Sequence, residues 1–400
     1  MVKTASLFSQ LLGMFPRSEF ASLVKKHGAE RNAKGFDSWM QFVAMLFCQI
    51  GRADSLREIC NGLACCVGKL AHLGLAGAPK RSTLSYANSH RSSELFRDLF
   101  FMALDRFRSQ SGLGSRKTKF RFKNKLYSLD STTITLCLSL FPWASFRRVK
   151  GGVKAHVLLD HDDYMPAYVL LTEARRHDVT MARQMAIPAG SIVVMDRGYS
   201  DYALFAEWDR QGLFFVTRLK EGAVYEVFET LDVRSGGNVL SDQAITLTGV
   251  RGEKVCSGVL LRRIVVWDQF RQCELVLLTN MPTLASSTIG AIYKDRWEIE
   301  LFFKCLKQNL KVKTFVGTTE NALRIQIWTA LIALLLLKWA HHLSRAAWSL
   351  SNLACMLRLN LFTYRDFMEW LHDPFGTPAV IPETEQLLLL TSPLGQAART

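Results

Sequence analysis

The N-terminal part of the chain places apolar side chains at helical spacing. Apolar residues recur three and four positions apart through residues 5–110, the period that gives an amphipathic helix one buried face. Glycine and proline at 74–79 interrupt the pattern, and Ser82 or Thr83 can cap a new helix after them. This region is therefore predicted to be helical. The recurring positions are Phe8, Leu11, Leu12 and Phe15, then Phe42, Met45, Leu46 and Ile50, then Leu95, Leu99 and Met102.

The pattern changes to that of β-strands after a basic run at 116–125. Residues 126–134 are rich in β-branched side chains, as is typical of a strand. Three strands, a helix, a strand, a helix and a strand follow in this order, which is that of a ribonuclease-H-like core with a mixed sheet flanked by helices. The predicted elements after the first strand are a hairpin at 153–159 and 167–172, a short helix at 179–185, a strand at 192–195, a helix at 201–211 and a strand at 213–216.

Residues 222–285 differ from both neighbours. They contain runs of Val, Thr and Leu with glycine-rich breaks at Gly236-Gly237 and Gly252, which indicates an all-β insertion. A helical pattern returns near Leu284 and continues to about Trp370. The tail from Pro374 onward is expected to be peripheral.

The charge of the chain is uneven. The formal net charge is +15, and residues 1–125 hold 21 Lys and Arg against 8 Asp and Glu. A strongly basic segment attached to a near-neutral remainder indicates a polyanionic partner, most commonly nucleic acid; a merely soluble basic surface is the alternative. Basic residues also surround one predicted short helix, as in a helix-turn-helix-like DNA reader, although many helical domains share this pattern. They are Lys80, Arg81, His90 and Arg91.

The cysteines and the ends of the chain bear on the cellular compartment. None of the nine cysteines forms a Cys-x-x-Cys motif, so they are interpreted as small buried hydrophobic residues of a reducing compartment rather than zinc ligands or disulfides. The N-terminus lacks the features of a secretory signal. The apolar run from Leu331 to Leu337 is shorter than the ~20 residues of a membrane span and is expected to be a buried helix. A cytoplasmic protein is predicted.

Two aspartates are candidates for chemistry. Asp130 is predicted to end the apolar-leaning first strand, and Asp196 to end the apolar fourth strand. Functional groups gather at strand ends in open α/β sheets, and these two strands are neighbours in a ribonuclease-H-like sheet, so the carboxylates can share a metal. The alternative is that each aspartate caps the turn that follows it.

A predicted helix at 291–311 carries the most specific pattern. Its polar and aromatic residues fall within one stripe about 100° wide at 100° per residue, whereas the rest of the helix is mostly apolar. Glu300 lies on the stripe and Glu298 does not, so Glu300 is the candidate ligand. An ordinary amphipathic helix with a Glu300–Lys304 ion pair is the alternative. The stripe consists of Tyr293, Arg296, Trp297, Glu300, Lys304, Lys307 and Lys311.

These residues resemble a known family. Tyr293, Arg296, Glu300 and Lys307 match in spacing the Tyr-Arg-Glu-Lys signature of one branch of bacterial insertion-sequence transposases of the DDE class. Asp130 and Asp196 resemble the first two acidic residues of that class. The resemblance extends from about residue 5 to 370 and includes the position of the β insertion.

The resemblance implies a mechanism. Asp130, Asp196 and Glu300 are then the catalytic residues and the ligands of two Mg²⁺ ions, for which Mn²⁺ can substitute, and such ions suit in-line phosphoryl displacement. The expected DNA-binding residues are Tyr293, Arg296, Trp297, Lys304 and Lys307. Trp297 and Tyr293 are also candidates for stacking on an unpaired base at a DNA hairpin, through which relatives pass.

Further expectations concern partners and nearby residues. The family implies a homodimer that brings two transposon ends together in a synaptic complex before transfer to target DNA. His156 and the pair His177–Asp178 can approach the site, although a core or surface role is commoner for such histidines. Two alternatives stay open: a DNA-binding regulator without catalysis, and a ribonuclease-H-like nuclease without strand transfer.

The expected organisation is an α/β protein whose ribonuclease-H-like catalytic core is interrupted by an all-β insertion and preceded by an α-helical DNA-binding region. The predicted boundaries are 1–115 for the helical region, 116–221 and 286–375 for the two parts of the core, 222–285 for the insertion and 376–400 for the tail.

Overall fold

The computed structural model describes most of the chain and divides it into two compact units. One unit joins residues 1–103 to 331–400, and the other consists of residues 104–330. The predicted domain boundaries separate regions of different proposed function, whereas these units are defined by their internal contacts. The predicted boundaries therefore stay predictions. The described residues are 5–380 without 32, 34, 67, 115–118, 137–140, 142, 144, 148–149, 234–235, 250–255, 257 and 311–314.

The first unit is helical. The helix α3 (Ser38–Gly51) is apolar on nearly all sides and almost wholly buried, as expected of a central helix. Its N-terminus is capped by Asp37, whose side chain accepts a hydrogen bond from the Met40 amide. The other helices are α1 (Leu7–Leu12), α2 (Arg17–Lys26), α4 (Leu56–Ala64), α5 (Arg81–His90), the first part of α6 (Glu94–Ser111), the last part of α12 (Glu320–Leu343), α13 (Leu350–Asn360) and α14 (Phe367–His372).

Residues 7–8 and 361–363, far apart in the sequence, lie together within this unit. The Leu7 and Phe8 amides donate hydrogen bonds to the carbonyls of Thr363 and Leu361, and the Phe8 ring packs edge-on against Phe362. Helix α5 starts one residue before the predicted caps: its N-cap residue is Lys80, and no side chain caps it. The prediction of a Ser82 or Thr83 cap is therefore wrong, because the helix already includes both residues.

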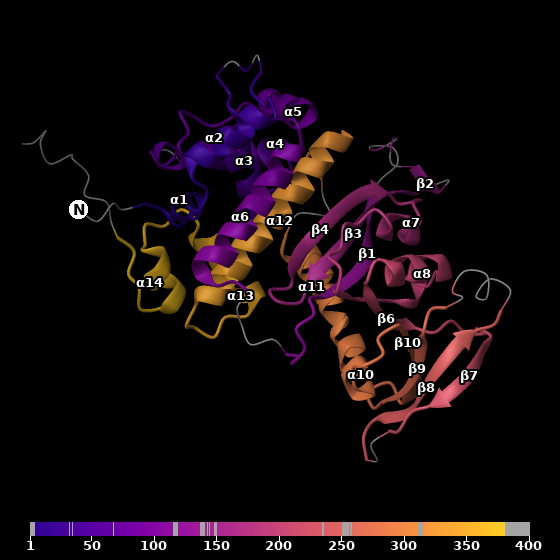
Figure 1. Ribbon diagram of the computed structural model, residues 1–400. Helices are drawn as coiled ribbons and strands as arrows, with labels where there is room; N and C mark the ends of the chain where they lie inside the picture. Colours follow the sequence, from indigo (N-terminus) through magenta and orange to yellow (C-terminus); the bar gives the residue numbers. More distant parts are fainter. Residues whose placement is uncertain are drawn as a thin grey trace, which may run out of the picture. The chain divides into compact units, whose positions relative to one another are not determined.

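The second unit is built on one sheet (Figure 1). The first strand, β1 (Leu126–Leu136), pairs antiparallel with β3 (Lys150–Asp160), which pairs antiparallel with β4 (Met165–Glu173). On its other side β1 pairs parallel with β5 (Ile192–Met195), and β5 pairs parallel with β6 (Phe214–Arg218). Helix α7 (Asp178–Ala182) precedes β5 and α8 (Tyr202–Arg210) follows it. Apart from a short additional strand, β2 (Ser145–Arg147), the predicted order of elements is confirmed, and the mixed sheet is consistent with a ribonuclease-H-like domain.

The segment after β6 continues the same sheet. Its last strand, β10 (Cys273–Thr279), pairs antiparallel with β6, and the sheet goes on through β9 (Leu261–Asp268), β8 (Val239–Leu247) and β7 (Tyr225–Thr230). A buried ion pair between Asp242 and Arg262 joins β8 to β9. These strands therefore extend the sheet instead of forming a separate one.

Helix α12 is longer than the apolar run within it. The helix spans Glu320–Leu343 and is long and apolar enough to cross a membrane by length and composition alone, so the argument from the short run Leu331–Leu337 is wrong as to length. Most of its apolar window, 89%, is buried inside the protein, as is usual for the core helix of a globular protein. The prediction that the run is a buried helix is confirmed.

The cysteines are less uniform than predicted. Among the described residues every cysteine is free, but only Cys48, Cys60 and Cys256 are buried, whereas Cys65 and Cys273 are exposed. An apolar sequence context therefore does not guarantee burial. Cys137 lies outside the described residues.

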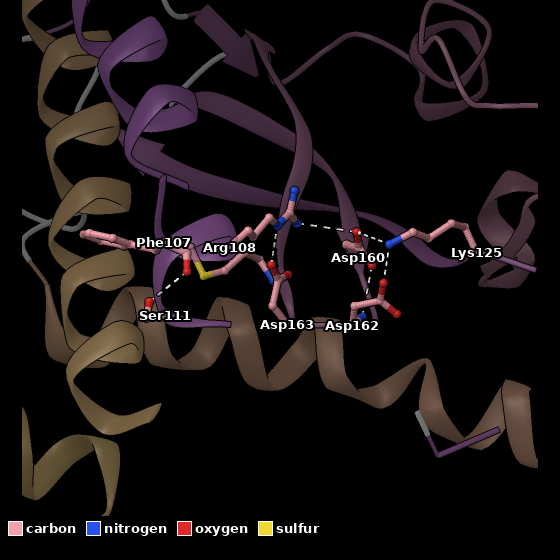
Figure 2. Close-up of polar contacts among 8 residues, drawn as sticks. Phe107, Arg108, Ser111, Lys125, Asp160, Asp162 and Asp163 are labelled. Carbon is pink, nitrogen blue, oxygen red and sulfur yellow. Dashed lines mark hydrogen bonds and ion pairs between the residues drawn. The ribbon is translucent and has the colours of Figure 1, made fainter. Parts of the chain in front are cut away.

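The hairpin turn between β3 and β4 is held by a cluster of charged groups (Figure 2). Nε of Arg108, in the last turns of α6, donates to Asp163 Oδ2 at 2.7 Å, and its Nη2 lies 3.4 Å from Asp160 Oδ2. From the other side Lys125 pairs with Asp162 and lies 3.5 Å from Asp160. Burial raises the pKa of Asp160, and the neighbouring carboxylates add to this effect. The two cations thus offset repulsion among three carboxylates in one turn.

Replacing Arg108 with Ala is expected to lower the free energy of unfolding by about 1–3 kcal/mol, because the buried Asp163 carboxylate then loses its charged partner. Urea unfolding of the two proteins at pH 7.5 measures the difference. The matched control is Arg210→Ala, which removes an exposed side chain that donates to the Ala206 carbonyl of its own helix and should change stability by less than about 0.5 kcal/mol. Equal stability of Arg108→Ala and wild type would show that the cluster contributes nothing.

Candidate active site

The sheet brings Asp130 and Asp196 to neighbouring positions. The last paired residues of the parallel ladder are Leu129 of β1 and Met195 of β5, so the two aspartates follow directly on adjacent strands. Asp196 ends β5 as predicted, but Asp130 lies in the middle of β1, which continues to Leu136 through its pairing with β3. The prediction that Asp130 ends its strand is therefore wrong. Only the parallel pairing of β1 with β5 ends next to Asp130, at Leu129.

Both aspartates belong to the same face of the sheet. Side chains alternate along a strand, and Leu126 of β1 and Ile192 and Val194 of β5 lie in one core cluster with Ile289 and Ile292. Asp130 and Asp196 stand an even number of positions from these strand residues. Their side chains are thus placed on the sheet face that packs against the helix containing Ile289.

The helix over this face is interrupted. The structure has α10 (Ser286–Asp295) and α11 (Trp297–Asn309) with a break at Arg296, so the single helix predicted for 291–311 is wrong. The Arg296 amide still donates to the Ile292 and Tyr293 carbonyls, at 3.2 and 3.3 Å. The predicted stripe is therefore shared between two helices. Lys311 lies outside the described residues.

Arg296 connects two of the candidate carboxylates. Its Nη1 lies 3.6 Å from Asp130 Oδ2 and 3.6 Å from Glu300 Oε1. Among the described residues, its buried Nε and Nη1 atoms have no hydrogen-bond partner. A guanidinium whose N–H groups have ion-pair but no hydrogen-bond partners can donate to a further anion, such as a phosphate.

The protonation of Asp130 reflects the other two carboxylates. Burial above all, together with the charges of Asp196 and Glu300, raises the pKa of Asp130 to about 7, against the lowering effects of the Ser131 amide and Arg296. The three acidic groups therefore interact electrostatically. Such mutual repulsion favours the binding of a cation.

The three carboxylates are suitable metal ligands by chemical type, but they lie too far apart to hold one ion together. All three offer the hard carboxylate oxygens that Mg²⁺ prefers. In the part of the chain that the structure describes, however, no three His, Cys, Asp or Glu side chains stand close enough together to hold a metal ion. Binding a cation would therefore require the carboxylates to draw together around it.

Asp196 also has the capping role considered for it. Its Oδ1 accepts a hydrogen bond of 2.8 Å from the Gly198 amide and so starts the turn at Arg197–Tyr199. A Cβ atom at position 198 would lie 3.0 Å from this same oxygen. Glycine in the Asp-Arg-Gly sequence thus allows the backbone to approach the carboxylate.

The remaining stripe residues take different positions. Lys307 donates to Thr132 Oγ1 and to the Thr133 carbonyl of β1, so it ties α11 to the strand that carries Asp130. Trp297 is 52% exposed and Lys304 is exposed. Tyr293 is half-buried, and burial raises its pKa. The ion pair of Glu300 is with Arg296 rather than the Lys304 pair of the alternative interpretation.

The other face of β1 carries a second polar group. His156 is fully buried, and its Nδ1 lies 3.2 Å from Asp178 Oδ1. Burial alone would raise the pKa of Asp178, but hydrogen bonds from His156 and Ser131 and the charge of Lys154 lower it to about 2. Ser131 follows Asp130 directly. His156 and Asp178 are therefore next to the site, whereas the structure gives no such contact for His177 among its described interactions.

A third polar group was not foreseen from the sequence. Ser128, His161 and Asp295 are connected by hydrogen bonds beside Arg296. His161 falls between the two strands of the hairpin predicted at 153–159 and 167–172, and Asp295 within the helix predicted at 291–311. The sequence gives no signal that links positions so far apart along the chain.

Comparison with known proteins identifies relatives for both parts of the chain. Residues 121–336 match a family profile described as a transposase DDE domain, and residues 3–76 match a domain of unknown function, DUF4372. A predicted transposase of Sinorhizobium fredii is 30% identical over 72% of this chain and 79% of its own length. A predicted transposase for insertion sequence element IS5377 of Geobacillus stearothermophilus is 31% identical over 57% of this chain and 60% of its own. One for element IS4SA of Synechocystis is 26% identical over 64% and 70%.

Proposed function

Because this chain belongs to the DDE transposases, metal-dependent enzymes that cleave DNA and transfer its strands, we propose that it binds the ends of an insertion sequence, hydrolyses them and joins the 3′-OH ends to target DNA. The observation that carries the proposal is the placement of Asp130 and Asp196 on adjacent parallel strands, on the sheet face next to Glu300. The proposed setting is the bacterial cytoplasm, where the nucleoid supplies both DNA substrates.

The three carboxylates are proposed to hold two Mg²⁺ ions, for which Mn²⁺ can substitute. When bound, such ions stabilise the attacking and leaving oxygens of an in-line phosphoryl displacement. The raised pKa of Asp130 supports this role, because a bound cation relieves the repulsion that raises it. Asp130, Asp196 and Glu300 then orient the ions, and no side chain has to act as the nucleophile.

Arg296 is proposed to bind the phosphate at which the reaction occurs. Its Nε and Nη1 atoms are buried beside Asp130 and Glu300 and have no hydrogen-bond partner among the described residues, and a guanidinium can donate charge-assisted hydrogen bonds to a phosphate. Lys304, exposed one turn beyond Glu300, and Lys307 are proposed to contact neighbouring phosphates. Such contacts position DNA without reading its sequence.

The Tyr-Arg-Glu-Lys branch is proposed on the spacing of Tyr293, Arg296, Glu300 and Lys307, and with it a hairpin intermediate. The exposed ring of Trp297 offers a surface on which an unpaired base can stack, while the half-buried Tyr293 ring lies beside Arg296, 5.9 Å from its guanidinium carbon. Denaturing gels of cleaved ends test this step, because a hairpin end runs as a single strand of doubled length. Free double-stranded ends from the first time point onward would contradict it.

The experiment that tests the proposed function uses labelled DNA carrying the end of the element that encodes this chain. The protein, the labelled end and an unlabelled target plasmid are incubated with Mg²⁺, and both cleavage and joining are measured. Cleavage followed by joining to the plasmid is expected. Cleavage without joining would indicate a ribonuclease-H-like nuclease, and binding without cleavage would indicate a DNA-binding regulator.

The helical N-terminal unit is proposed to bind the element ends through α5. One side of this helix is exposed, contains no acidic residue, and carries Arg81, serines and an aromatic stack of Tyr86 on His90 with ring centroids 4.0 Å apart. Tyr86 is 66% exposed. A positively charged helix with hydroxyl and aromatic groups is suited to a DNA groove.

Replacing Arg81 and Tyr86 together with Ala is expected to weaken binding of the end about 10-fold or more, since a phosphate contact and a groove contact are both lost. Fluorescence anisotropy at several salt concentrations measures this effect, and the salt dependence should become shallower. Lys25→Ala, which removes an exposed charge from α2, is the control and should weaken binding by less than about threefold. An unchanged affinity of the double variant would exclude α5 as the contact.

A homodimer that holds two ends in one synaptic complex is also proposed, because joining both ends of an element to a target requires two active sites. Light scattering of the protein with and without end DNA measures the number of chains. A complex of one chain with one end during joining would contradict the dimer.

A further inference from the structure

A buried polar chain crosses from the sheet to the helix break. Nε2 of His161 lies 2.6 Å from Ser128 Oγ, and its Nδ1 lies 2.8 Å from Asp295 Oδ2. The second oxygen of Asp295 pairs with Lys119. The side chains of His161 and Asp295 are 6% and 3% exposed, and Ser128 is fully buried. Both ring nitrogens of the histidine and both oxygens of the carboxylate are thus engaged.

The partners determine which nitrogen carries a proton. Burial alone would raise the pKa of Asp295, but the hydrogen bonds from His161 and Lys119 lower it below the ordinary range. An ionised carboxylate only accepts hydrogen bonds, so Nδ1 of His161 donates to Asp295. In the neutral ring Nε2 then accepts from the Ser128 hydroxyl. This arrangement fixes the orientation of the ring between the strand and the helix.

One end of the chain lies on the strand that carries Asp130. Ser128 and Asp130 are two positions apart on β1 and therefore belong to the same face. Thr132, two positions further, contacts Lys307 of α11. Ser128, Asp130 and Thr132 thus lie on the face of β1 that is directed toward α10 and α11. Ser128 contacts His161, which bonds to Asp295 of α10. Asp130 pairs with Arg296, and Thr132 contacts Lys307 of α11.

The other end of the chain lies at the helix break. Asp295 is the last residue of α10 and directly precedes Arg296, whose guanidinium lies between Asp130 and Glu300. No side chain caps the N-terminus of α11 at Arg296. The hydrogen bond from His161 to Asp295 therefore connects the last residue before the break to the sheet, five residues before Glu300.

We propose that Ser128, His161 and Asp295 are positioning residues that hold the break between α10 and α11 against β1 and thereby set the placement of Arg296 and Glu300 opposite Asp130. This inference rests on the proposed function of that site. None of the three residues touches DNA or the reacting atoms in this role. A displacement of about 1 Å at a reacting centre can lower a rate as much as 100-fold, so the polar chain should act on the rate of the chemical step.

The test is the single-turnover rate of end cleavage with Mg²⁺ by enzyme already bound to end DNA. Asp295→Asn is expected to cleave ~10–100-fold more slowly than wild type, with the dissociation constant for the end changed less than about threefold. The control is Asp242→Asn, since Asp242 is also 3% exposed, ion-paired and in the same compact unit. It should lose thermal stability but cleave within about threefold of wild type.

Histidine variants separate positioning from mere stability. Asn at position 161 can still donate a hydrogen bond to Asp295, whereas Ala cannot, so His161→Asn is expected to cleave faster than His161→Ala by about fivefold or more at equal DNA affinity. Should Asp295→Asn not fold, Ser128→Ala serves in its place, because it removes only the terminal hydrogen bond and leaves the buried carboxylate paired. Its cleavage rate should fall by about threefold or more.

Three results would overturn the inference: a folded Asp295→Asn enzyme that cleaves like wild type, a loss of DNA affinity that accounts for its slower cleavage, or an equal rate loss in Asp242→Asn. Failure of the wild-type protein to cleave its own end would instead overturn the proposed function. The two failures are thus distinguishable.

Discussion

Glu300→Gln is expected to bind end DNA like wild type and to cleave it on the order of 10³-fold more slowly, or not at all. The amide keeps the size of the side chain and one acceptor oxygen but removes the negative charge that a divalent ion requires. Glu300 lies on α11, 3.6 Å from Arg296 and close enough to Asp130 to raise its pKa. Cleavage of labelled end DNA with Mg²⁺ and a parallel binding assay measure both quantities.

Glu298→Gln is the matched control for this prediction. Glu298 lies on the same helix and is half-buried, as Glu300 is, but two residues turn the helix by about 200°, which directs it away from the carboxylate site. The Glu298→Gln enzyme should cleave end DNA at a rate within about threefold of the wild-type rate. If Glu300→Gln cuts as fast as Glu298→Gln, Glu300 is not the third ligand. If both are inactive, the helix as a whole rather than one carboxylate is required.

Asp130→Asn is expected to be more stable than wild type in the absence of metal and yet inactive. Because the pKa of Asp130 is raised to about 7, whereas an unfolded aspartate titrates near 3.9, the folded protein holds this proton more tightly. The ionised group therefore destabilises the folded state progressively as the pH rises from about 4 to 7. At pH 8 the full penalty applies, and Asn removes it, which should raise the free energy of unfolding by about 1–3 kcal/mol.

The measurement is denaturant unfolding of both proteins with EDTA at pH 5 and pH 8. The difference between them should be larger at pH 8, because wild-type Asp130 is mostly protonated at pH 5. Added Mg²⁺ at pH 8 should stabilise wild type and leave Asp130→Asn nearly unchanged. A variant less stable than wild type at pH 8, or a difference that does not depend on pH, would show that the surroundings of Asp130 do not disfavour its ionised form.

The combination of these outcomes is characteristic of a metal site rather than of an ordinary ion pair. An aspartate whose main role was to pair with Arg296 would stabilise the fold at neutral pH, and its loss would cost stability. The pKa of Asp178 on the other face of β1 is lowered to about 2 by its partners, as expected of such a structural carboxylate. The opposite directions of the two pKa shifts distinguish the roles of the two residues.

The order of strands in the second unit could be predicted because it depends on local patterns. Alternating and apolar runs identify strands of the sheet, and the ribonuclease-H-like order of the elements predicts the first next to the fourth. The ladder from Leu126 to Leu129 beside Ile192 to Met195 has this arrangement. The roles of Asp130, Asp196 and Glu300 stay predictions until the variants are measured.

Other features could not be predicted because no local pattern records them. The helix break at Arg296 lies in a sequence whose periodicity continues without a glycine or proline, and propensity is only a weak guide to such a position. The hydrogen bonds from His161 to Ser128 and Asp295 join residues 33 and 134 positions apart. These residues come into contact only in the tertiary structure, where the strand and the helix lie together.

The sequence by itself determined the secondary-structure order of the sheet and the basic character of the N-terminal part, because each follows from composition or from the period of a short segment. That Asp130 and Asp196 lie on neighbouring strands was expected from the ribonuclease-H-like order of the elements. Tertiary structure alone decided that Arg296 lies between Asp130 and Glu300, that His161 ties the strand to the helix break, and that the C-terminal helices pack with the N-terminal ones. These contacts depend on which faces pack together when the chain folds. The hydrophobic effect favours the burial of an apolar face but does not specify which other face it packs against.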